Sequence, residues 1–480
     1  MNFRSVLSYT GTMLEILGIL CLVPVLVSWY FGDQAGLSFV VAAIISFAFG
    51  TVLDKHFNKS EIDLGSAMTI TAVSFILISL FGALPFLSYM QPVDAVFESV
   101  SGFTTTGLSV INLPETMPQS LVFWRSFTQW IGGIGILVIF LMLMGSPGIS
   151  SFYLYKAEGA AEKLEAGVKH SVSKIFKIYG FYTVLGILLL YLAGLPVFDS
   201  LVVAFSSIST GGFAPHSASM AAYQNNIAEL IVMFLMVAGA TSFFVHDRIL
   251  RGRIKGKLRL LGGRTLEYSR NPETQFFWVI LAAFFILLSV AFWGFAAEPL
   301  KAGIFHTVSA LTTTGFTTVN IASSQLVMFL IILLMIIGGY AGSTSGGLKL
   351  VRVGIIAKSF SWIGRKMSYP QEAVIPFKFG RKLIKEHTLA MVFLFVCIYL
   401  VLLVLSGVAM MFLGYSPMDG FFIVSSAQGT VGFSTIDLAA MAWQGKVLLM
   451  INMMLGRLEI FPFVVLLYSI YDSLKGKEKW

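Results

Sequence analysis

The sequence predicts an all-α membrane protein in which four non-identical repeats follow a two-helix hairpin. Three observations support this fold class. Of the 480 residues, 57% are hydrophobic and only 12% are charged, against about 25% charged in an ordinary soluble domain. Ten apolar stretches follow one another along the chain, and one short motif recurs four times between them. So little charge cannot cover a water-soluble surface, so lipid must be the solvent of this fold.

Each apolar stretch is long enough to cross a bilayer, whose hydrocarbon core of about 30 Å needs roughly 20 helical residues. Helices are expected because lipid offers backbone N–H and C=O groups no other partner. The first two predicted spans form the hairpin. The spans lie near Leu14–Phe31, Leu37–Leu53, Ala67–Leu87, Ser120–Met144, Ile178–Val197, Ile227–Val245, Phe276–Ala297, Gln325–Ile363 (interrupted), Thr388–Leu413 and Val447–Tyr471.

Lysine and arginine gather in three of the loops between the spans, whereas the other loops are mostly acidic. The basic loops lie at residues 156–177, 248–270 and 349–385. By the positive-inside rule these loops face the cytoplasm, which also places both termini inside. Basic clusters occur in nucleic-acid-binding proteins as well, but topology explains them fully here. No nucleic-acid partner is therefore expected.

Four short segments align without gaps, and each lies between two spans on the external side. They begin at Asp94, Asp199, Ala302 and Asp419. The aligned positions are a glycine (Gly107, Gly212, Gly315, Gly432), a threonine two positions before it (Thr105, Thr210, Thr313, Thr430) and a serine six positions before it (Ser101, Ser206, Ser309, Ser426). One copy would mean little, but four copies in register indicate a repeated structural unit.

The apolar segment before each glycine is only about eight residues long, or roughly 12 Å of helix. This is less than half the membrane, so the segment must enter the bilayer and return. Re-entrant backbone is tolerated only where it is buried in protein or lines a water-filled cavity. Each repeat is therefore predicted to read helix–pore helix–filter–helix, with the four repeats arranged around one pore.

The turn at each glycine has the composition of an ion selectivity filter, which replaces the water around a cation with backbone carbonyl oxygens. Glycine reaches the positive φ that such a backbone needs. Threonine adds hydroxyl oxygens, and the short helix points its partly negative C-terminus at the cation. The candidate ion-binding residues are Thr105, Thr106, Gly107, Thr210, Gly211, Gly212, Thr313, Thr314, Gly315, Thr430, Val431 and Gly432.

Plainer roles stand beside these. Each glycine could simply cap its short helix, the commoner role of a single glycine after an apolar run. Asp94, Asp199 and Asp419 are most simply read as N-caps of the short helices. The serines are expected to fix the short helix against its neighbours rather than to touch an ion.

An interruption divides the eighth span. Residues Gly338–Gly347 are poor in helix formers. The preceding Leu326–Ile337 is about 18 Å of helix, which places the break near the membrane midplane, where broken helices mark transport sites in other carriers. A packing kink is the alternative. A phosphate-binding loop is excluded, because Leu348 rather than glycine precedes Lys349 and no strand precedes the loop.

Arg457 lies in the last span, about eleven residues and roughly 17 Å inside it. A charge at that depth costs at least about 2.5 kcal/mol and usually marks a functional or paired position. The guanidinium either faces the ion path or forms a buried ion pair, for example with Glu459, although residues two apart do not face each other on a helix. We favour the first interpretation.

These motifs resemble the superfamily of potassium transporters that comprises the bacterial Trk and Ktr membrane subunits and their plant (HKT) and yeast relatives. The resemblance extends from Ala67 to the C-terminus. Each copy keeps a single glycine, as in this superfamily, and lacks the TVGYG filter of familiar potassium channels. The two extra spans before the first repeat match the Trk membrane subunit rather than the shorter Ktr subunit. Sodium-preferring relatives carry serine in the first copy, where this chain has Gly107.

The resemblance implies potassium uptake across the inner membrane of a bacterial cell, through a gated, carbonyl-lined pore driven by the electrochemical gradient. It implies that the interruption is a gating loop and that Arg457 faces it. The gate residues are then Gly338, Gly339, Gly342, Ser343, Gly346, Gly347 and Arg457. The implied partners are membrane lipid, a second copy of the chain and a cytosolic nucleotide-binding ring of the TrkA type. K+ is the substrate, no cofactor is expected, and no constellation typical of an enzyme is visible.

The predicted boundaries follow the repeats, with the hairpin at 1–65 and pore repeats at 66–150, 151–255, 256–368 and 369–480. The third repeat contains the gating loop. One rival function stays open. A symporter that couples K+ to H+ or Na+ would need an intramembrane ion-binding group outside the filter, for which Glu98 and Glu459 are the candidates.

Overall fold

The computed structural model describes residues 3–57, 59, 63–135, 168–247, 271–370, 375–380 and 382–475. The predicted cytoplasmic loop 248–270 lies outside these ranges, as do residues 156–167 of the predicted loop 156–177 and the end of the predicted span Ser120–Met144.

The described chain is helical almost throughout, which confirms the prediction of an all-α protein. The exception is a short antiparallel pair of strands, β1 (Lys378–Phe379) and β2 (Lys382–Leu383). The helices are α1 Phe3–Leu20, α2 Val23–Phe31, α3 Gly36–His56, α4 Leu64–Gly82, α5 Pro92–Phe103, α6 Gln119–Ile134, α9 Val168–Leu192, α10 Val197–Ile208, α11 Asn226–Ala240, α14 Pro272–Phe292, α15 Pro299–Leu311, α16 Gln325–Ile337, α17 Leu350–Met367, α18 Glu386–Phe412, α19 Pro417–Gln428, α20 Trp443–Arg457 and α21 Phe461–Leu474, with short 3₁₀ helices η1 Leu84–Ser88, η2 Pro114–Thr116, η3 Ser219–Ala222 and η4 Ile321–Ser323.

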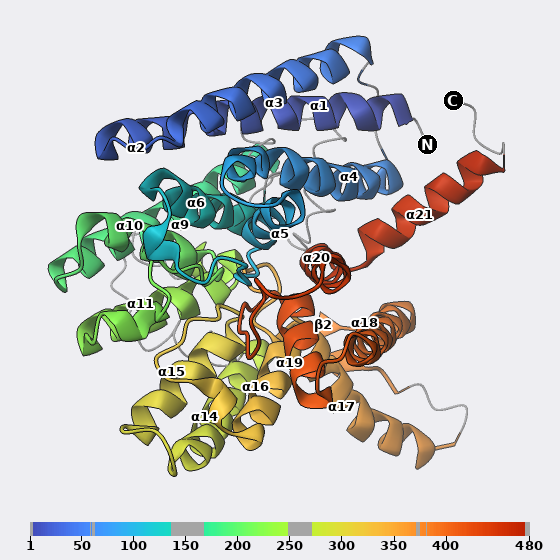
Figure 1. Ribbon diagram of the computed structural model, residues 1–480. Coiled ribbons are helices and arrows are strands. Elements are labelled where there is room, and N and C mark those ends of the chain that lie inside the picture. The colour runs from blue at the N-terminus through green and yellow to red at the C-terminus, as the bar shows by residue number, and fades with distance from the viewer. Residues whose placement is uncertain are drawn as a thin grey trace, which may run out of the picture.

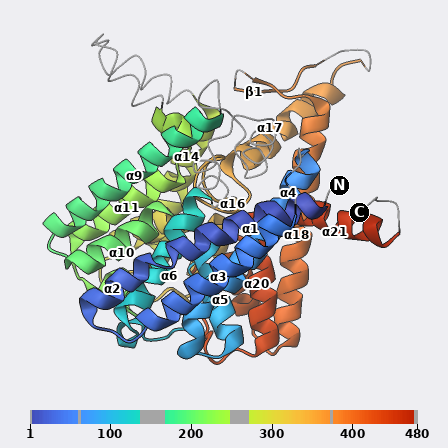
Figure 2. The ribbon, with the colours of Figure 1, turned by 90° about the horizontal axis from the view of Figure 1, so that it is seen from above.

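Four groups of helices lie around a common centre in chain order (Figure 1). Each group holds one short helix: α5 lies with α4 and α6, α10 with α9 and α11, α15 with α14 and α16, and α19 with α18 and α20. The last helix of each group packs against the short helix of the next, so that α6 contacts α10, α11 contacts α15, α16 contacts α19 and α20 contacts α5. The last of these contacts closes the circle. In Figure 2, α17 and β1 lie at one end of the molecule and α5 lies towards the other.

Buried apolar side chains fill the space between neighbouring groups rather than one central core. The outer faces of the peripheral helices are apolar as well. Leu37, Ile286 and Leu405 are 73%, 61% and 61% exposed, respectively. A surface of this kind is stable where lipid rather than water surrounds it.

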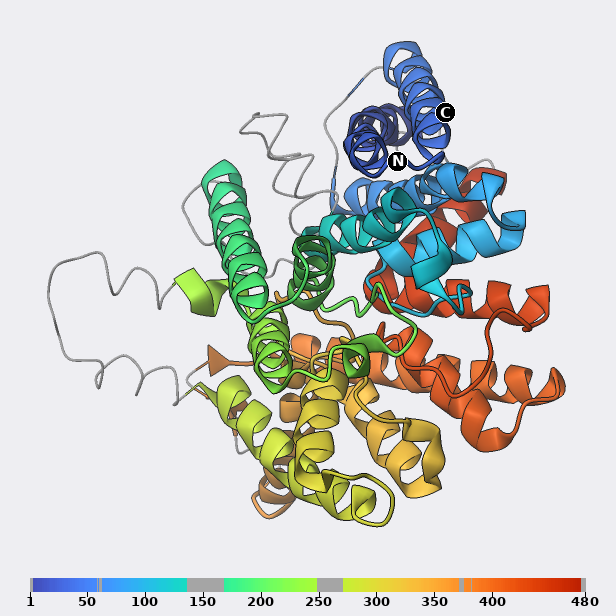
Figure 3. The same cartoon turned by 60° about the vertical axis from the view of Figure 1, so that its left-hand side comes forward.

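Helices α1 and α3 form the predicted hairpin, which lies outside the first group (Figures 1 and 3). Gly11 on α1 faces Gly50 on α3, and a Cβ on either glycine would lie 2.6 Å from the carbonyl oxygen of the other. Small residues allow helices in a membrane to approach this closely. The first helix starts at Phe3, earlier than the predicted span, and its polar residues find partners on other helices. Ser8, for example, donates a hydrogen bond of 2.9 Å to the Asp54 carboxylate.

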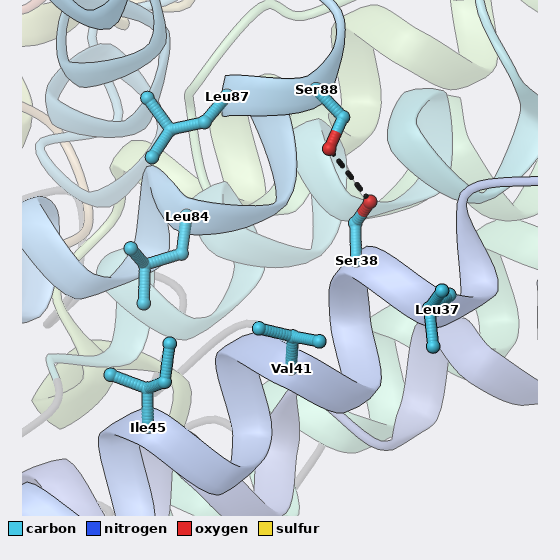
Figure 4. A pocket seen from close by; sticks show the side chains of 7 residues that line it. All are labelled: Leu37, Ser38, Val41, Ile45, Leu84, Leu87 and Ser88. Carbon is cyan, nitrogen blue, oxygen red and sulfur yellow. Dashed lines mark hydrogen bonds between the residues drawn. The ribbon is translucent and has the colours of Figure 1, made fainter.

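The hairpin packs on the first group through α1 against α4 and α2 against α6, and further contacts reinforce this. The Asp33 carboxylate accepts the backbone N–H of Ser120 at 2.9 Å, at the start of α6. α3 also lies against η1 along a small pocket lined mostly by leucine, valine and isoleucine side chains (Figure 4). At the edge of this pocket the hydroxyls of Ser38 and Ser88 lie 3.1 Å apart.

The prediction of one continuous last span at Val447–Tyr471 is wrong. Helices α20 and α21 meet at an angle of 107°, and α21 leaves the fourth group to pack on α4. Glu459 and Ile460 between them have φ values of 58° and 64°, a region that bulky and β-branched residues rarely occupy. The sequence signal for the break is Pro462, which lacks the N–H that a continuing helix needs.

Six of the helices in the described ranges are long and apolar enough to cross a membrane, or seven if the bent pair α20–α21 counts as one span. The chain is thus a multi-pass membrane protein. α11 and α16 were predicted to belong to spans but have 15 and 13 residues. α16 ends at Ile337, directly before the predicted interruption, so the break in the eighth span is confirmed.

Candidate functional site

The four short helices α5, α10, α15 and α19 end in the same way. In each, the N–H of the residue before the aligned glycine donates to the carbonyl of the aligned serine, and the N–H of the aligned threonine donates to the carbonyl three residues back. The first bond joins Thr106 to Ser101 (2.9 Å), Gly211 to Ser206 (2.8 Å), Thr314 to Ser309 (2.9 Å) and Val431 to Ser426 (2.8 Å). This pair of bonds is the Schellman motif of a helix C-terminus.

Threonine occupies the left-handed position of each Schellman motif, where glycine is the usual residue. The φ values are 54° for Thr105, 53° for Thr210, 57° for Thr313 and 50° for Thr430. A non-glycine residue held there carries strain of about 1 to 3 kcal/mol. The alternative in which the aligned glycines cap the short helices is therefore wrong, because threonine already does so.

The aligned glycines have their own backbone requirement. Their φ values are 86° for Gly107, 78° for Gly212, 88° for Gly315 and 97° for Gly432, which only glycine adopts readily. A Cβ on any of them would overlap a carbonyl oxygen of the next repeat. Gly107 faces the oxygen of Gly211, Gly212 that of Thr314, Gly315 that of Val431, and Gly432 that of Thr106.

These contacts run once around the molecule and return to the first repeat. We call residues 105–107, 210–212, 313–315 and 430–432 the four-turn ring. The structure thus brings together all the residues that the sequence singled out as candidate ion ligands. The oxygens of the ring are backbone carbonyls and threonine hydroxyls, without a carboxylate. Within the described ranges no cluster of three or more His, Cys, Asp or Glu side chains could hold a metal ion. The C-termini of the four short helices, which carry a partial negative charge, end at the ring.

The aspartates of the short helices are not N-caps, as the sequence analysis proposed. Gln91, Pro196 and Ser416 occupy the N-cap positions of α5, α10 and α19, and each aspartate stands three residues further on. At that position the negative carboxylate still interacts favourably with the partly positive N-terminus of the helix, and it can also bind a neighbouring side chain. The Asp94 carboxylate lies 2.6 Å from the Lys446 ammonium on α20, which joins the fourth repeat to the first.

Three of the four aligned serines fix the short helices, as expected. Ser206 donates to Ser126 of α6 at 3.0 Å. Ser309 donates to the carbonyl of Phe316 at 2.8 Å, and Ser426 accepts the N–H of Gly432 at 3.1 Å. In three repeats the serine therefore ties the helix either to the turn that follows it or to the neighbouring repeat.

The interruption after α16 lies directly against the four-turn ring. The hydroxyls of Thr344 and Thr210 lie 3.1 Å apart, and the Thr344 hydroxyl also donates to the carbonyl of Gly239 at 2.9 Å. The N–H of Gly346 donates to the Thr313 hydroxyl at 2.8 Å. A Cβ on Gly346 would overlap the hydroxyl of Thr430. The interruption thus reaches three of the four left-handed threonines.

The other candidate gate residues shape this loop. Gly338, Gly342 and Gly347 have φ values of 72°, 69° and 74°, so glycine is required at both ends and in the middle. A Cβ on Gly339 would overlap the Ser345 hydroxyl. Ser343 donates to the carbonyl of Tyr340 at 2.6 Å. Ten residues of tightly turned backbone therefore pass beneath the ring, in place of a merely kinked helix.

Arg457 completes the contact with the ring. Its guanidinium donates to the carbonyl of Thr344 at 2.5 Å and to the hydroxyl of Thr105, the fourth left-handed threonine, at 3.2 Å. It also donates to the carbonyls of Gly132 and Gly133 at the end of α6. The side chain therefore faces the interruption, as the family resemblance implies.

The two carboxylates considered for coupled transport have other partners. Glu459 is bound by Arg352 of α17. Glu98 is buried and lies 2.6 Å from Nε of Arg125, whose side chain is 3% exposed. It also accepts the N–H of Val110 at 3.1 Å. Both carboxylates therefore have positive partners within the protein.

Three residues in or beside the ring and the loop were missed by the sequence reasoning, and Arg125 among them contacts Phe213 and Ala214 directly after the second turn. Arg125 and Gln129 are polar residues within an apolar span, and this was the available signal. Gln129 binds the second turn of the ring. Lys349 is buried beside the loop and donates to the carbonyl of Ser345. The sequence analysis counted it in the basic loop 349–385 and weighed it as part of a phosphate-binding motif, but not as a contact of the gate.

Comparison with known proteins gives consistent results. Residues 35–476 match the TrkH family, described as cation transport proteins. The chain is 33% identical to an uncharacterized cation transporter of Methanocaldococcus jannaschii, over 98% of this chain and 96% of that protein. It is 30% identical to the Trk system potassium uptake protein TrkH of Halomonas elongata, over 97% and 98% of the two chains. It is similar to the crystal structure of the potassium transporter TrkH from Vibrio parahaemolyticus, with a TM-score of 0.85, 26% identity and coverage of 97% of this chain and 99% of that one.

Proposed function

Because the chain belongs to the TrkH family of cation transport proteins, we propose that it carries potassium ions across a membrane through the four-turn ring. The family is one of transporters and not of enzymes. The observation that carries the proposal is the closed circle of contacts between each aligned glycine and the next repeat. Relatives named potassium uptake proteins support K+ as the ion.

The chemistry of the ring suits a monovalent cation. A filter of neutral carbonyl and hydroxyl oxygens replaces the hydration shell of an ion without binding it too tightly to leave. Carboxylates would instead hold a divalent ion. The ring is reinforced by the contact of each turn with the next, so the oxygens keep their spacing while an ion passes.

The membrane potential is a sufficient driving force for accumulation. It contributes about 2.3 kcal/mol per charge per 100 mV. That energy sustains roughly a 50-fold gradient, because about 1.4 kcal/mol corresponds to tenfold. Nucleotide hydrolysis by the chain itself is not needed.

We infer that the structure corresponds to a closed state. The loop and Arg457 together contact all four left-handed threonines on one side of the ring, and the guanidinium adds a positive charge where a cation would pass. A steric obstacle and an electrostatic barrier therefore coincide. Opening requires the loop to leave the ring.

A channel is favoured over a symporter by the state of the two candidate carboxylates. A coupling site for H+ or Na+ needs a group that gains and loses its ligand during transport. Glu98 is held by Arg125, Ser109 and the Val110 N–H, and Glu459 is held by Arg352. Each carboxylate is already paired with an arginine side chain of the protein.

Reversal potentials of the purified chain in liposomes test this function. With K+ and Na+ gradients imposed separately, the reversal potential is expected to follow the K+ gradient and to stay unchanged when a pH gradient is added. A reversal potential that shifts with pH at fixed K+ and Na+ would show transport coupled to protons. Equal permeability to both ions would overturn potassium selectivity.

We further propose that the chain lies in the inner membrane with both termini cytoplasmic, that two copies associate, and that a cytosolic nucleotide-binding ring of the TrkA type controls opening. The likeness to Trk membrane subunits supports this assembly. The loop also continues directly into α17, whose last turn carries exposed Arg365 and Lys366. A partner bound to this end of α17 could pull on the loop.

Nucleotide dependence tests the partner. Adding ATP or a dinucleotide is expected to change K+ flux only when the ring protein is present and bound. Reversing the charges of Arg365 and Lys366 should weaken co-elution of the two proteins and leave the flux of the isolated chain unchanged. A response of the isolated chain to nucleotide would contradict the proposed division of roles.

A further inference from the structure

The second turn of the ring is built differently from the other three at the position before its glycine. Repeats 1 and 3 have Thr106 and Thr314 there, and each hydroxyl lies 2.8 Å from a neighbouring threonine hydroxyl of its own repeat. Repeat 4 has Val431, and repeat 2 has Gly211. Gly211 is not among the residues with positive φ. Its backbone alone therefore does not require glycine.

The side chain of Gln129 occupies the space that a side chain at position 211 would fill. Gln129 belongs to α6, in the preceding repeat, and is fully buried. Its Nε2 donates to the carbonyl of Gly211 at 2.6 Å, and its Oε1 accepts the N–H of Phe213 at 3.1 Å. A Cβ on Gly211 would overlap Cδ of Gln129. The amide thus bridges the two residues that flank the aligned glycine of this turn.

The oxygen that Gln129 holds belongs to the contact between two repeats. The carbonyl oxygen of Gly211 is the atom that Gly107 of the first turn faces. Its position therefore sets the spacing between the first and second turns. A buried carbonyl with a fixed donor cannot reorient freely, because losing the bond would leave a buried polar group unsatisfied.

Two neighbours of Gln129 bind the same part of the second repeat. Ser126, one turn earlier on α6, accepts from Ser206. The guanidinium of Arg125 lies 4.2 Å from the ring centre of Phe213 and donates to the carbonyl of Ala214 at 3.3 Å. One face of α6 therefore holds the second turn from its short helix to the residue after Phe213.

We propose that Gln129 is a positioning residue for ion selection, which supplies from the first repeat the side chain that the second turn lacks. This inference rests on the proposed function of the ring. In repeats 1 and 3 a threonine inside the turn fills this position, whereas in repeat 2 the amide of Gln129 does so from the neighbouring helix. Loss of the amide frees the Gly211 carbonyl to move and increases the distance between the first and second turns.

A double-mutant cycle tests the proposal, with K+/Na+ permeability ratios measured from bi-ionic reversal potentials in liposomes. Gln129→Ala is expected to lower the ratio by about tenfold, which corresponds to about 1.4 kcal/mol. Gly211→Thr alone is expected to lower it as well, because the new side chain meets Gln129. The combination of Gln129→Ala with Gly211→Thr rebuilds the arrangement of repeats 1 and 3. It should return the ratio to within about threefold of the wild-type value, a strongly non-additive result.

Controls separate positioning from general stability. Asn452 is a buried amide on α20, the inner helix of repeat 4, and it pairs with Ser406 of α18 rather than with the ring. Asn452→Leu should alter thermal stability without changing the permeability ratio. Gln129→Met keeps the volume of the side chain but makes neither hydrogen bond, so it is expected to lower the permeability ratio as Gln129→Ala does. It replaces Gln129→Ala in the test if the alanine variant folds poorly.

The outcomes distinguish this inference from the proposed function. A wild-type chain without potassium selectivity would refute the function of the ring itself. A selective wild type with unchanged permeability ratios in Gln129→Ala and Gln129→Met would refute the role of Gln129 alone. If the losses of permeability ratio in Gln129→Ala and Gly211→Thr simply add in the double variant, a threonine at position 211 does not replace the amide of Gln129, and the proposal is refuted.

Discussion

We expect Arg457→Ala to raise the basal potassium flux of the isolated chain by about ten- to hundredfold. The guanidinium donates to the carbonyl of Thr344 in the loop and to carbonyls at the end of α6. Hydrogen bonds that involve a charged group contribute about 1.5 to 3 kcal/mol each, and about 1.4 kcal/mol corresponds to tenfold. Losing the one to Thr344 releases the loop, and the substitution also removes a positive charge from the ion path. Ion preference should not change, because the ring keeps its geometry.

Two further variants separate the contributions to closure. Arg457→Lys keeps the charge but loses the planar arrangement of donors, so its flux should lie between those of the wild type and Arg457→Ala. Shortening the loop within Gly342–Gly346 should raise flux as well. Combined with Arg457→Ala, it should give less than the product of the two effects, because both act on one contact. Liposome flux or single-channel recording measures these values. An unchanged or lower basal flux in well-folded Arg457→Ala would refute this gate.

The second large effect is expected at the first turn of the ring, where Gly107→Ser should lower the K+/Na+ permeability ratio by about tenfold or more. Serine disfavours the φ of 86° that Gly107 adopts, at a cost of about 1 to 2 kcal/mol. Its Cβ would overlap the carbonyl oxygen of Gly211. The turn must therefore move away from its neighbour, and the spacing of the oxygens changes. Gly315→Ser should act in the same way, because Gly315 faces Val431 with the same geometry.

Gly194 provides a matched control for this experiment. Its φ is 98°, and a Cβ there meets nothing within 4 Å. Gly194→Ser therefore introduces the same backbone strain without a steric overlap, at a position between α9 and α10 and outside the four-turn ring. It should reduce stability slightly and leave the permeability ratio unchanged. If Gly107→Ser has no more effect on the ratio than Gly194→Ser, the ring does not select ions.

The in-register repeat allowed the turns to be located from the sequence, because a backbone conformation that only glycine tolerates leaves a residue signature. The same logic placed the interruption after α16, where several glycines are required by positive φ. Both features are local, and their residue types follow from backbone geometry.

Features that depend on contacts between repeats were harder to predict. The left-handed residue of each turn is threonine, and its conformation is stabilised by surrounding structure rather than by its own preference. Asp94 pairs with Lys446 across 352 positions of the chain, so a motif within one repeat could only indicate an N-cap. Gln129 appeared as one polar residue in an apolar span. Its role became visible only when α6 was placed against the second turn.

The occupancy of the ring by an ion tests the central claim most directly. Rubidium and thallium ions replace potassium in many sites and scatter X-rays anomalously, so crystals grown with either ion would locate it without reference to flux. We predict a peak on the axis of the four-turn ring, between residues 105–107, 210–212, 313–315 and 430–432. It should weaken in Gly107→Ser and persist in Arg457→Ala. Anomalous density confined to other places, with none at the ring, would contradict the proposal that these turns form the path for potassium.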